Sequence, residues 1–445
     1  MEFLIKALQL IMSLSILIVL HELGHFIPAK LFKTRVEKFY LFFDPWFSLI
    51  KKKIGDTEYG IGWLPLGGYV KISGMIDESM DKDQMVKPAE SWEFRAKPAW
   101  QRLIIMLGGV TVNLLLGIFI YSMTLYVYGD KYLPNNNLTD GVWCVNDLAT
   151  DLGFETGDKI ISADDVELKR FSDVLEKIIV SDVITVLRDG DMIDLTMPVD
   201  VIDKFINSEN KTILFPRIPT IISGFTENSN CEKAGLLVKD KIVGINGVSV
   251  KYHDQLTKEL KAYKDTLVLV DVIRDGERIV FNTKVDEGGL LGFSVANLSL
   301  GQLEGLGVYD MASFKYTLLA SFPAGYNKAI KKLNSYIDQF VLILSPSTGA
   351  YKGLGGFGTI GSLFPATWNW EIFWNLTAFL SLMLAFMNVL PIPALDGGHI
   401  VFLLYEMVVG KAAPEKVMES AQVVGMFLLL GLILYANAND ILRLF

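Results

Sequence analysis

Four long apolar stretches constrain the fold of this 445-residue chain more than any other feature of its sequence. They cover residues 3–20, 103–128, 372–395 and 421–438. A helix needs roughly 20 residues to cross the ~30 Å hydrocarbon core of a bilayer. Charged residues make up 20% of the chain and hydrophobic residues 51%, which is more apolar than a typical soluble domain. We therefore expect a polytopic α-helical membrane protein with four transmembrane helices.

Other classes of protein fit the sequence poorly. No small-residue cleavage site follows the first stretch, as a signal peptide would require. Acidic residues outnumber basic ones by 50 to 41, so no dominant basic surface points to nucleic acid as a partner. The two cysteines, Cys144 and Cys231, are too few for a disulfide framework or a cysteine zinc site, and we expect them to be unpaired.

The distribution of basic residues predicts the orientation in the membrane. Lysine and arginine are dense between the first two apolar stretches, and Lys411 and Lys416 lie between the last two. Short loops rich in these residues stay in the cytoplasm. Residues 129–371 and both termini are therefore predicted to lie on the extracytoplasmic side.

The first apolar stretch leads into the sequence HELGH, which suggests a metal site. His21 and His25 are four residues apart and project from one face of a helix, where both imidazoles can reach one zinc ion. Glu22 lies where it can take a proton from a metal-activated water. These could be ordinary polar residues at a membrane interface, but the chain has only four histidines and two of them lie here. We therefore predict a zinc site.

A catalytic zinc ion usually has three protein ligands and one open position, so a third ligand is expected elsewhere. The first and third apolar stretches run in the same direction across the membrane, so their ends reach the same side. Pro391 and Pro393 interrupt the third stretch near its end. Asp396 follows as the first charged residue and can supply an oxygen ligand. His399 is a rival, and the residues alone do not decide between them.

A buried asparagine in the second stretch is a further candidate. By helical rise, Asn113 is expected about 15 Å into the membrane from its cytoplasmic edge. Gly108 and Gly109 precede it and permit close helix packing. A catalytic role and a role as polar glue between helices are both consistent with this position.

The three motifs together resemble those of the site-2 protease family, which are intramembrane zinc metalloproteases. HExxH lies on the first stretch, GxxxN (Gly109 to Asn113) on the second, and NxxPxPxLDGGH (Asn388 to His399) on the third. The resemblance covers nearly the whole chain and is closest to the bacterial regulator-of-sigma-E protease type. That type carries tandem PDZ domains between its second and third spans.

The resemblance implies a role for each motif residue. His21, His25 and Asp396 would be the zinc ligands, and Glu22 the general base. Asn388 and Pro391 would help to position the substrate backbone, with Asn113 as a further contact. Substrates would be single-pass membrane proteins already shortened outside the membrane, such as anti-sigma factors, and remnant signal peptides. The location would be the bacterial inner membrane, with residues 129–371 in the periplasm.

The segment from residue 58 to 74 is apolar and rich in glycine, and does not suit a long helix. It predicts two short strands joined near residues 65–68 into a membrane-associated, re-entrant β-hairpin. Such a hairpin could bind an extended substrate by strand addition, with contacts from Gly67, Gly68 and Tyr69. A structural plug without substrate contact is the alternative.

An internal repeat occupies the extracytoplasmic segment. Residues 152–166 and 234–248 share one pattern, and each copy continues to a hairpin turned at Arg-Asp-Gly, at residues 188–190 and 274–276. Both copies resemble PDZ domains, so the fold would carry two inserted α+β PDZ domains. They could bind peptide ligands or act as spacers or a size filter, and no ligand-reading residue separates these roles.

These observations divide the chain into five parts. The first two transmembrane helices and the re-entrant hairpin occupy residues 1–128, and the PDZ domains 129–215 and 216–298. A membrane-surface helix and a glycine-rich connector occupy 299–370, and the last two transmembrane helices 371–445.

Two other functions remain open from the sequence. A membrane PDZ scaffold or chaperone with a structural metal would have a closed shell, with His399 as a fourth ligand. A transporter is less well supported, because the four spans show no internal repeat. Neither function needs Glu22 between the two histidines, and this favours the protease.

Overall fold

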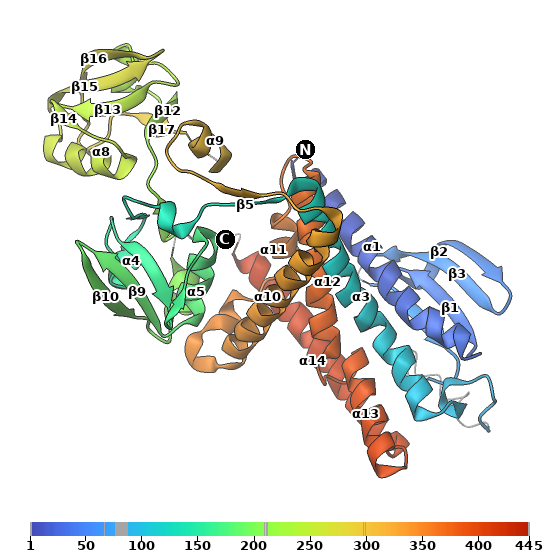
Figure 1. Ribbon diagram of the computed structural model, residues 1–445. Coiled ribbons are helices and arrows are strands. Elements are labelled where there is room, and N and C mark those ends of the chain that lie inside the picture. The colour runs from blue at the N-terminus through green and yellow to red at the C-terminus, as the bar shows by residue number, and fades with distance from the viewer. Residues whose placement is uncertain are drawn as a thin grey trace. The chain divides into compact units, whose positions relative to one another are not determined.

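The computed structural model describes residues 2–65, 67–75, 88–208, 210, 212–296, 298 and 300–443 (Figure 1). The chain divides into two compact units. The helical unit comprises Met1–Gly129, Lys315–Leu344 and Tyr351–Phe445, and the strand-rich unit comprises Asp130–Phe314 and Ser345–Ala350. Each unit is described separately below.

Four helices of the helical unit are long and apolar enough to cross a membrane, as predicted. They are α1 (Glu2–Leu31), α3 (Ala99–Tyr128), α12 (Trp370–Val389) and α14 (Glu415–Leu442). Two of them differ from the predicted bounds in a way that matters for the site. The first continues as helix through HELGH to Leu31, and the third ends at Val389, before the two prolines.

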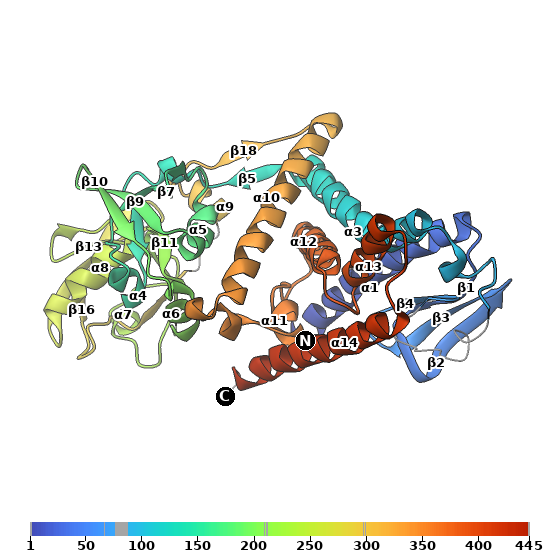
Figure 2. The same ribbon diagram turned by 90° about the horizontal axis from the view of Figure 1, so that it is seen from below.

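Helix α3 lies at the centre of this unit and packs against α1, α10 (Leu318–Leu344), α12 and α13 (Asp396–Val409) (Figure 2). Glycines allow the backbones of α1 and α3 to touch. A Cβ atom built on Gly24 would lie 2.4 Å from the Gly108 carbonyl oxygen, and one on Gly108 would lie 1.9 Å from the Gly24 oxygen. Such close crossings hold helices together in a bilayer, where apolar burial contributes little.

Helix α10 accounts for the helix expected within residues 299–370. Its buried face is made mostly of small residues, and a Cβ atom on Gly325 would lie 2.2 Å from Ser122 Oγ in α3. Lys328 Nζ donates a 2.8 Å hydrogen bond to Asn375 Oδ1 in α12. A position on the membrane surface stays a prediction.

The segment after α1 forms a four-stranded sheet, and the predicted pairing within it is wrong. The strands are β1 (Val36–Leu41), β2 (Phe43–Ile54), β3 (Thr57–Leu64) and β4 (Tyr69–Ile72), in the order β2-β3-β1-β4. The expected hairpin would pair β3 with β4, but both pair with β1, β3 in parallel and β4 antiparallel.

The hairpin of this sheet is instead β2–β3, which turns at Gly55 with φ of 61°. Alternating apolar residues identify strands but not their partners, and β1 lies outside the segment 58–74 from which the hairpin is predicted. Within the described sheet, β4 pairs with β1 alone and is an edge strand.

The strand-rich unit contains two hydrophobic cores, one for each copy of the repeat. The first copy has a sheet of order β10-β9-β7-β8 and the second one of order β16-β15-β13-β12-β17, with β14 on β13. The strands of the first sheet are β7 (Lys159–Ala163), β8 (Val166–Glu167), β9 (Val183–Arg188) and β10 (Asp191–Thr196). Those of the second are β12 (Thr220–Phe225), β13 (Lys241–Ile245), β14 (Val248–Ser249), β15 (Leu267–Arg274), β16 (Glu277–Lys284) and β17 (Phe293–Val295).

Short elements complete both units. Two-stranded pairs join β5 (Asp130–Tyr132) to β18 (Ala312–Phe314) and β6 (Val142–Cys144) to β11 (Leu214–Pro216). The short helices are α4 (Asp147–Asp151), α5 (Val174–Val180), α6 (Val201–Asn207), α7 (Asn230–Lys233), α8 (His253–Leu260), α9 (Leu300–Gly305) and α11 (Phe357–Ser362).

Each copy contains an internal arginine–aspartate ion pair at the equivalent position, which supports the predicted repeat. In the first, Arg188 Nε donates to Asp158 Oδ1 at 2.8 Å, and its Nη2 donates to the Gly153 carbonyl at 2.7 Å. In the second, Arg274 makes the corresponding bonds to Asp240 at 2.7 Å and to the Gly235 carbonyl at 3.0 Å. These arginines end the strands that lead into the two Asp-Gly hairpin turns. The assignment of both copies as PDZ domains stays a prediction.

Candidate metal centre

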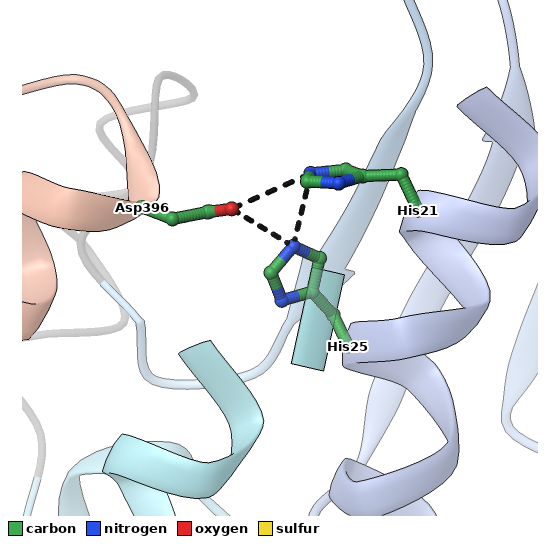
Figure 3. Close-up of side chains that lie close together, drawn as sticks. All are labelled: His21, His25 and Asp396. Carbon is green, nitrogen blue, oxygen red and sulfur yellow. Dashed lines mark hydrogen bonds and ion pairs between the residues drawn. The ribbon is translucent and has the colours of Figure 1, made fainter. Parts of the chain in front are cut away.

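The predicted ligands come from two segments far apart in sequence. His21 and His25 lie on one face of α1, and Asp396 is the first residue of α13 (Figure 3). Between α12 and α13 the chain leaves the helical conformation, and Ala394 has a φ of 76°. Left-handed backbone is unfavourable for alanine, so the local fold holds this residue where it turns the chain toward Asp396.

The three side chains form a nearly equilateral triangle. His21 Nε2 and His25 Nε2 lie 3.3 Å apart, and each lies 3.4 Å from Asp396 Oδ2 (Figure 3). Tetrahedral zinc with bonds of about 2.0–2.1 Å requires ligand atoms about 3.3–3.4 Å apart. Asp396 Oδ2 is buried without a hydrogen-bond partner in the described part of the chain, and a cation would satisfy it. Two imidazoles and one carboxylate, at these separations, fit a catalytic zinc ion.

A second layer of contacts orients the two imidazoles. His25 Nδ1 lies 2.8 Å from the Ile105 carbonyl oxygen, so it carries the proton and turns the Nε2 lone pair toward the centre. His21 Nδ1 lies 3.1 Å from Asn113 Nδ2, while Asn113 Oδ1 lacks a partner among the described residues. A half-turn of the amide exchanges the two atoms and lets Oδ1 accept from a protonated Nδ1. Asn113 would then fix the orientation of the His21 imidazole, as the Ile105 carbonyl fixes that of His25.

Gly109 leaves the space that the imidazoles fill. A Cβ atom built there would lie 2.3 Å from His25 Nε2 and 2.5 Å from His21 Cε1. The sequence predicts Gly109 as a packing residue and as part of the GxxxN motif, but it does not predict that this glycine makes room for the imidazoles. The GxxxN spacing was the available signal, because it puts Gly109 and Asn113 one turn apart on the same face of α3.

The triangle faces a cavity of about 640 Å³. Glu22 lines it, and so does the whole of β4 together with Gly68. A Cβ atom on Gly68 would lie 2.5 Å from Ile18 Cγ2 and 3.6 Å from Glu22 Cγ. Gly68 therefore lets the start of the edge strand lie beside the predicted general base.

The other predicted substrate-binding residues lie at different distances from this centre. Asn388 Nδ2 is 3.4 Å from His21 Nε2, and the Tyr69 hydroxyl lines the cavity while donating to Asp44 Oδ1 at 2.8 Å. Gly67 packs against the Phe43 ring and is not part of the cavity lining. Pro391 is exposed and does not line the cavity either.

His399, the rival ligand, lines the cavity without joining the triangle. Among the described residues, the group able to share one ion contains only His21, His25 and Asp396. A shell of three protein ligands leaves a position open, whereas the scaffold alternative required a fourth.

Comparison with known proteins identifies the family. The sequence profile of Peptidase family M50 matches residues 9–432. The chain belongs to peptidase family M50. This confirms the predicted site-2 protease family and makes the protein a zinc metalloendopeptidase of the membrane.

Relatives of this M50 peptidase match it from end to end. It is 27% identical to the regulator of sigma E protease of Haemophilus influenzae, over 100% of both chains. It is 26% identical to the metalloprotease MmpA of Caulobacter vibrioides, over 99% of this chain and 96% of the relative. A Vibrio cholerae relative with zinc metalloprotease in its name is 26% identical over 98% of each chain.

Proposed function

We propose that this M50 peptidase hydrolyses a peptide bond within a membrane-spanning segment of single-pass membrane proteins. One observation carries the proposal: β4, whose outer edge pairs with no strand among the described residues, lines the same cavity as Glu22 and the histidine–aspartate triangle. A site for cutting a helix that lies in lipid needs both a hydrolytic centre and a means of holding the chain extended.

The proposed zinc ligands are His21, His25 and Asp396. When bound, zinc supplies Lewis-acid activation of water and of the scissile carbonyl. Glu22 takes the proton from the attacking water and passes it to the leaving amine. Asn388, whose amide points to the same centre, donates a hydrogen bond to the carbonyl oxygen as negative charge develops on it.

Substrate binding is proposed to occur by strand addition to β4. A transmembrane helix buries its own peptide N–H and C=O groups in internal hydrogen bonds, so the bond to be cut must first be unwound. The free edge of β4 can pair with the unwound main chain, beginning at Gly68 and Tyr69. Gly67 serves the turn that leads into β4, and Pro391 helps to break the helix before Asp396.

The proposed substrates are anti-sigma factors already shortened outside the membrane, and remnant signal peptides. The name of the Haemophilus influenzae relative points to the former. The proposed location is a bacterial inner membrane, with both repeat copies in the periplasm as PDZ domains. There they would exclude proteins that still carry a large outer domain, or capture peptide ends.

The decisive experiment uses a reporter with one transmembrane helix and a short outer stub. We expect the wild-type protein to cleave it, and Glu22→Gln to retain zinc but lose cleavage by about 100-fold or more, as removal of a general base predicts. Zinc is quantified in both proteins, which separates loss of the base from loss of the metal.

Glu2→Gln provides the control for a lost carboxylate at the opposite end of the same helix and should cleave normally. If wild type and Glu22→Gln both hold zinc and neither cuts any of several truncated reporters, intramembrane cleavage is not the function. If Glu22→Gln cuts as fast as wild type, Glu22 is not the base.

A further inference from the structure

Most described residues of helix α14 are exposed or half-buried, yet one of its buried side chains lines the active-site cavity. Of its described residues, only Gln422 and Gly425 are buried. A Cβ atom on Gly425 would lie 1.8 Å from the Pro393 carbonyl oxygen, so only glycine lets the helix approach this closely. Pro393 lies three residues before Asp396. The contact therefore fixes α14 against the segment that presents the proposed third ligand.

Gln422 lies one turn before Gly425 on the same face of α14. It is 8% exposed and lines the cavity that also contains Glu22 and β4. It also lines a small adjoining pocket with Pro393 and His399. Helix α14 thus contributes a polar side chain to a site whose other described parts come from α1, α3, the sheet and the start of α13.

Among the residues that the structure describes, the Gln422 side chain makes no hydrogen bond, and its amide is not one of the enclosed polar atoms that lack a partner. It therefore opens to the cavity that it lines, where an apolar side chain of similar size would fill the same space without an amide to satisfy. Ordered water can satisfy the amide when no substrate is bound, because the cavity is large enough to hold several molecules. A substrate that enters the cavity displaces this water and can take over its hydrogen bonds.

A substrate segment that pairs with the edge of β4 needs a second hydrogen-bonding partner on its other side. Alternate residues of a strand direct their N–H and C=O groups to opposite sides, so β4 satisfies only one side of the substrate. The groups on the other side face the cavity, where each group that pairs with neither protein nor water is costly. A glutamine amide offers one acceptor and two donors, which match the N–H and C=O of one peptide unit.

We propose that Gln422 binds the main chain of the unwound substrate on the side that faces away from β4. Gln422 is a positioning residue and takes no part in proton transfer. This inference rests on the proposed function, because it assumes a membrane-spanning substrate held extended. It adds that the fourth transmembrane helix is part of the substrate-binding site.

The test compares wild type with Gln422→Met, which keeps the length of the side chain and removes the amide. Both cleave a series of transmembrane peptides in which one backbone N–H at a time is replaced by an ester oxygen. We expect Gln422→Met to raise KM by about 3- to 10-fold with kcat nearly unchanged. The variant loses one hydrogen bond that holds the substrate equally in the ground state and the transition state. Val424→Met, on the exposed face of the same helix, is the matched control.

The ester series distinguishes a hydrogen bond to substrate from helix packing. If Gln422 binds the substrate, one ester position weakens binding to wild type but has little further effect in Gln422→Met, so the two changes are not additive. Additive effects at every position would overturn the inference, while normal cleavage by wild type would leave the proposed function intact. If wild type cleaves none of the peptides, both fail.

A second measurement does not depend on turnover. A photo-crosslinking amino acid at position 422 of the Glu22→Gln protein should attach to an added transmembrane peptide, and the same group at position 424 should attach to lipid. Zinc content and thermal stability of Gln422→Met and Gln422→Leu show that both variants are folded. Equal peptide crosslinking from both positions, or none from 422, would contradict the inference.

Discussion

At the scale of the residue, Gly109 shows how little room the metal-binding side chains leave. Both imidazoles occupy the space where a Cβ atom would lie. We predict that Gly109→Ala weakens zinc binding by about 10- to 100-fold, the range seen when residues that orient metal ligands are changed. Titration with a competing zinc chelator measures this. Gly431→Ala in α14 is the control, because a Cβ atom there would meet nothing within 4 Å among the described residues. Unchanged zinc affinity of Gly109→Ala would show that the imidazoles can move aside without loss.

At the scale of the element, β4 derives its proposed role from its free edge. Neighbouring residues of a strand direct their N–H groups to opposite sides, so one of Val70→Pro and Lys71→Pro removes an N–H bonded to β1 and the other an N–H on the open edge. The edge variant should retain zinc and thermal stability but cleave the reporter about 3- to 10-fold more slowly. The other variant should be less stable.

Lys71→Ala controls for the 3.3 Å ion pair between Lys71 and Glu37, which proline also removes. Lys52→Pro and Lys53→Pro introduce proline at neighbouring positions of β2, at the opposite edge of the sheet, and the variant that keeps the β2–β3 hydrogen bonds should cleave normally. If both β4 variants are stable and fully active, the substrate does not pair with this strand.

At the scale of the whole molecule, both repeat copies can be removed without separating the chain ends that they leave, while Ser345–Ala350 of the strand-rich unit stays in place. Its first strand, β5, pairs with β18, with Asp130 opposite Phe314 and Tyr132 opposite Ala312. Residues 133–311 can therefore be replaced by a short turn. If the repeats act as a size filter, this variant should cut reporters that still carry a folded outer domain, which the full chain spares. If the repeats capture peptide, the variant should instead cleave trimmed reporters less well than the full chain.

The membrane part of the fold could be predicted because its signals are local. Length and apolar composition identify the four transmembrane helices, and spacing along one helix places His21 and His25 together. The Asp-Gly hairpin turns of the two repeats are local too, and β9–β10 and β15–β16 form as expected. The pairing of β3 with β4 could not be predicted from the same kind of signal, because strand partners depend on the arrangement of the whole sheet.

The apolar helices, the HELGH pair and the protease family could all be inferred without the structure, since each depends on residues close together or on motifs in order. Three further features required the fold: that Asp396 and not His399 completes the triangle, that Gly109 makes room for the imidazoles, and that Gln422 lines the cavity. These depend on distances between helices that are far apart in the chain. Helix crossings of this kind are set by backbone contact at glycines, such as Gly24 with Gly108 and Gly425 with Pro393, and no local pattern specifies which glycine meets which partner.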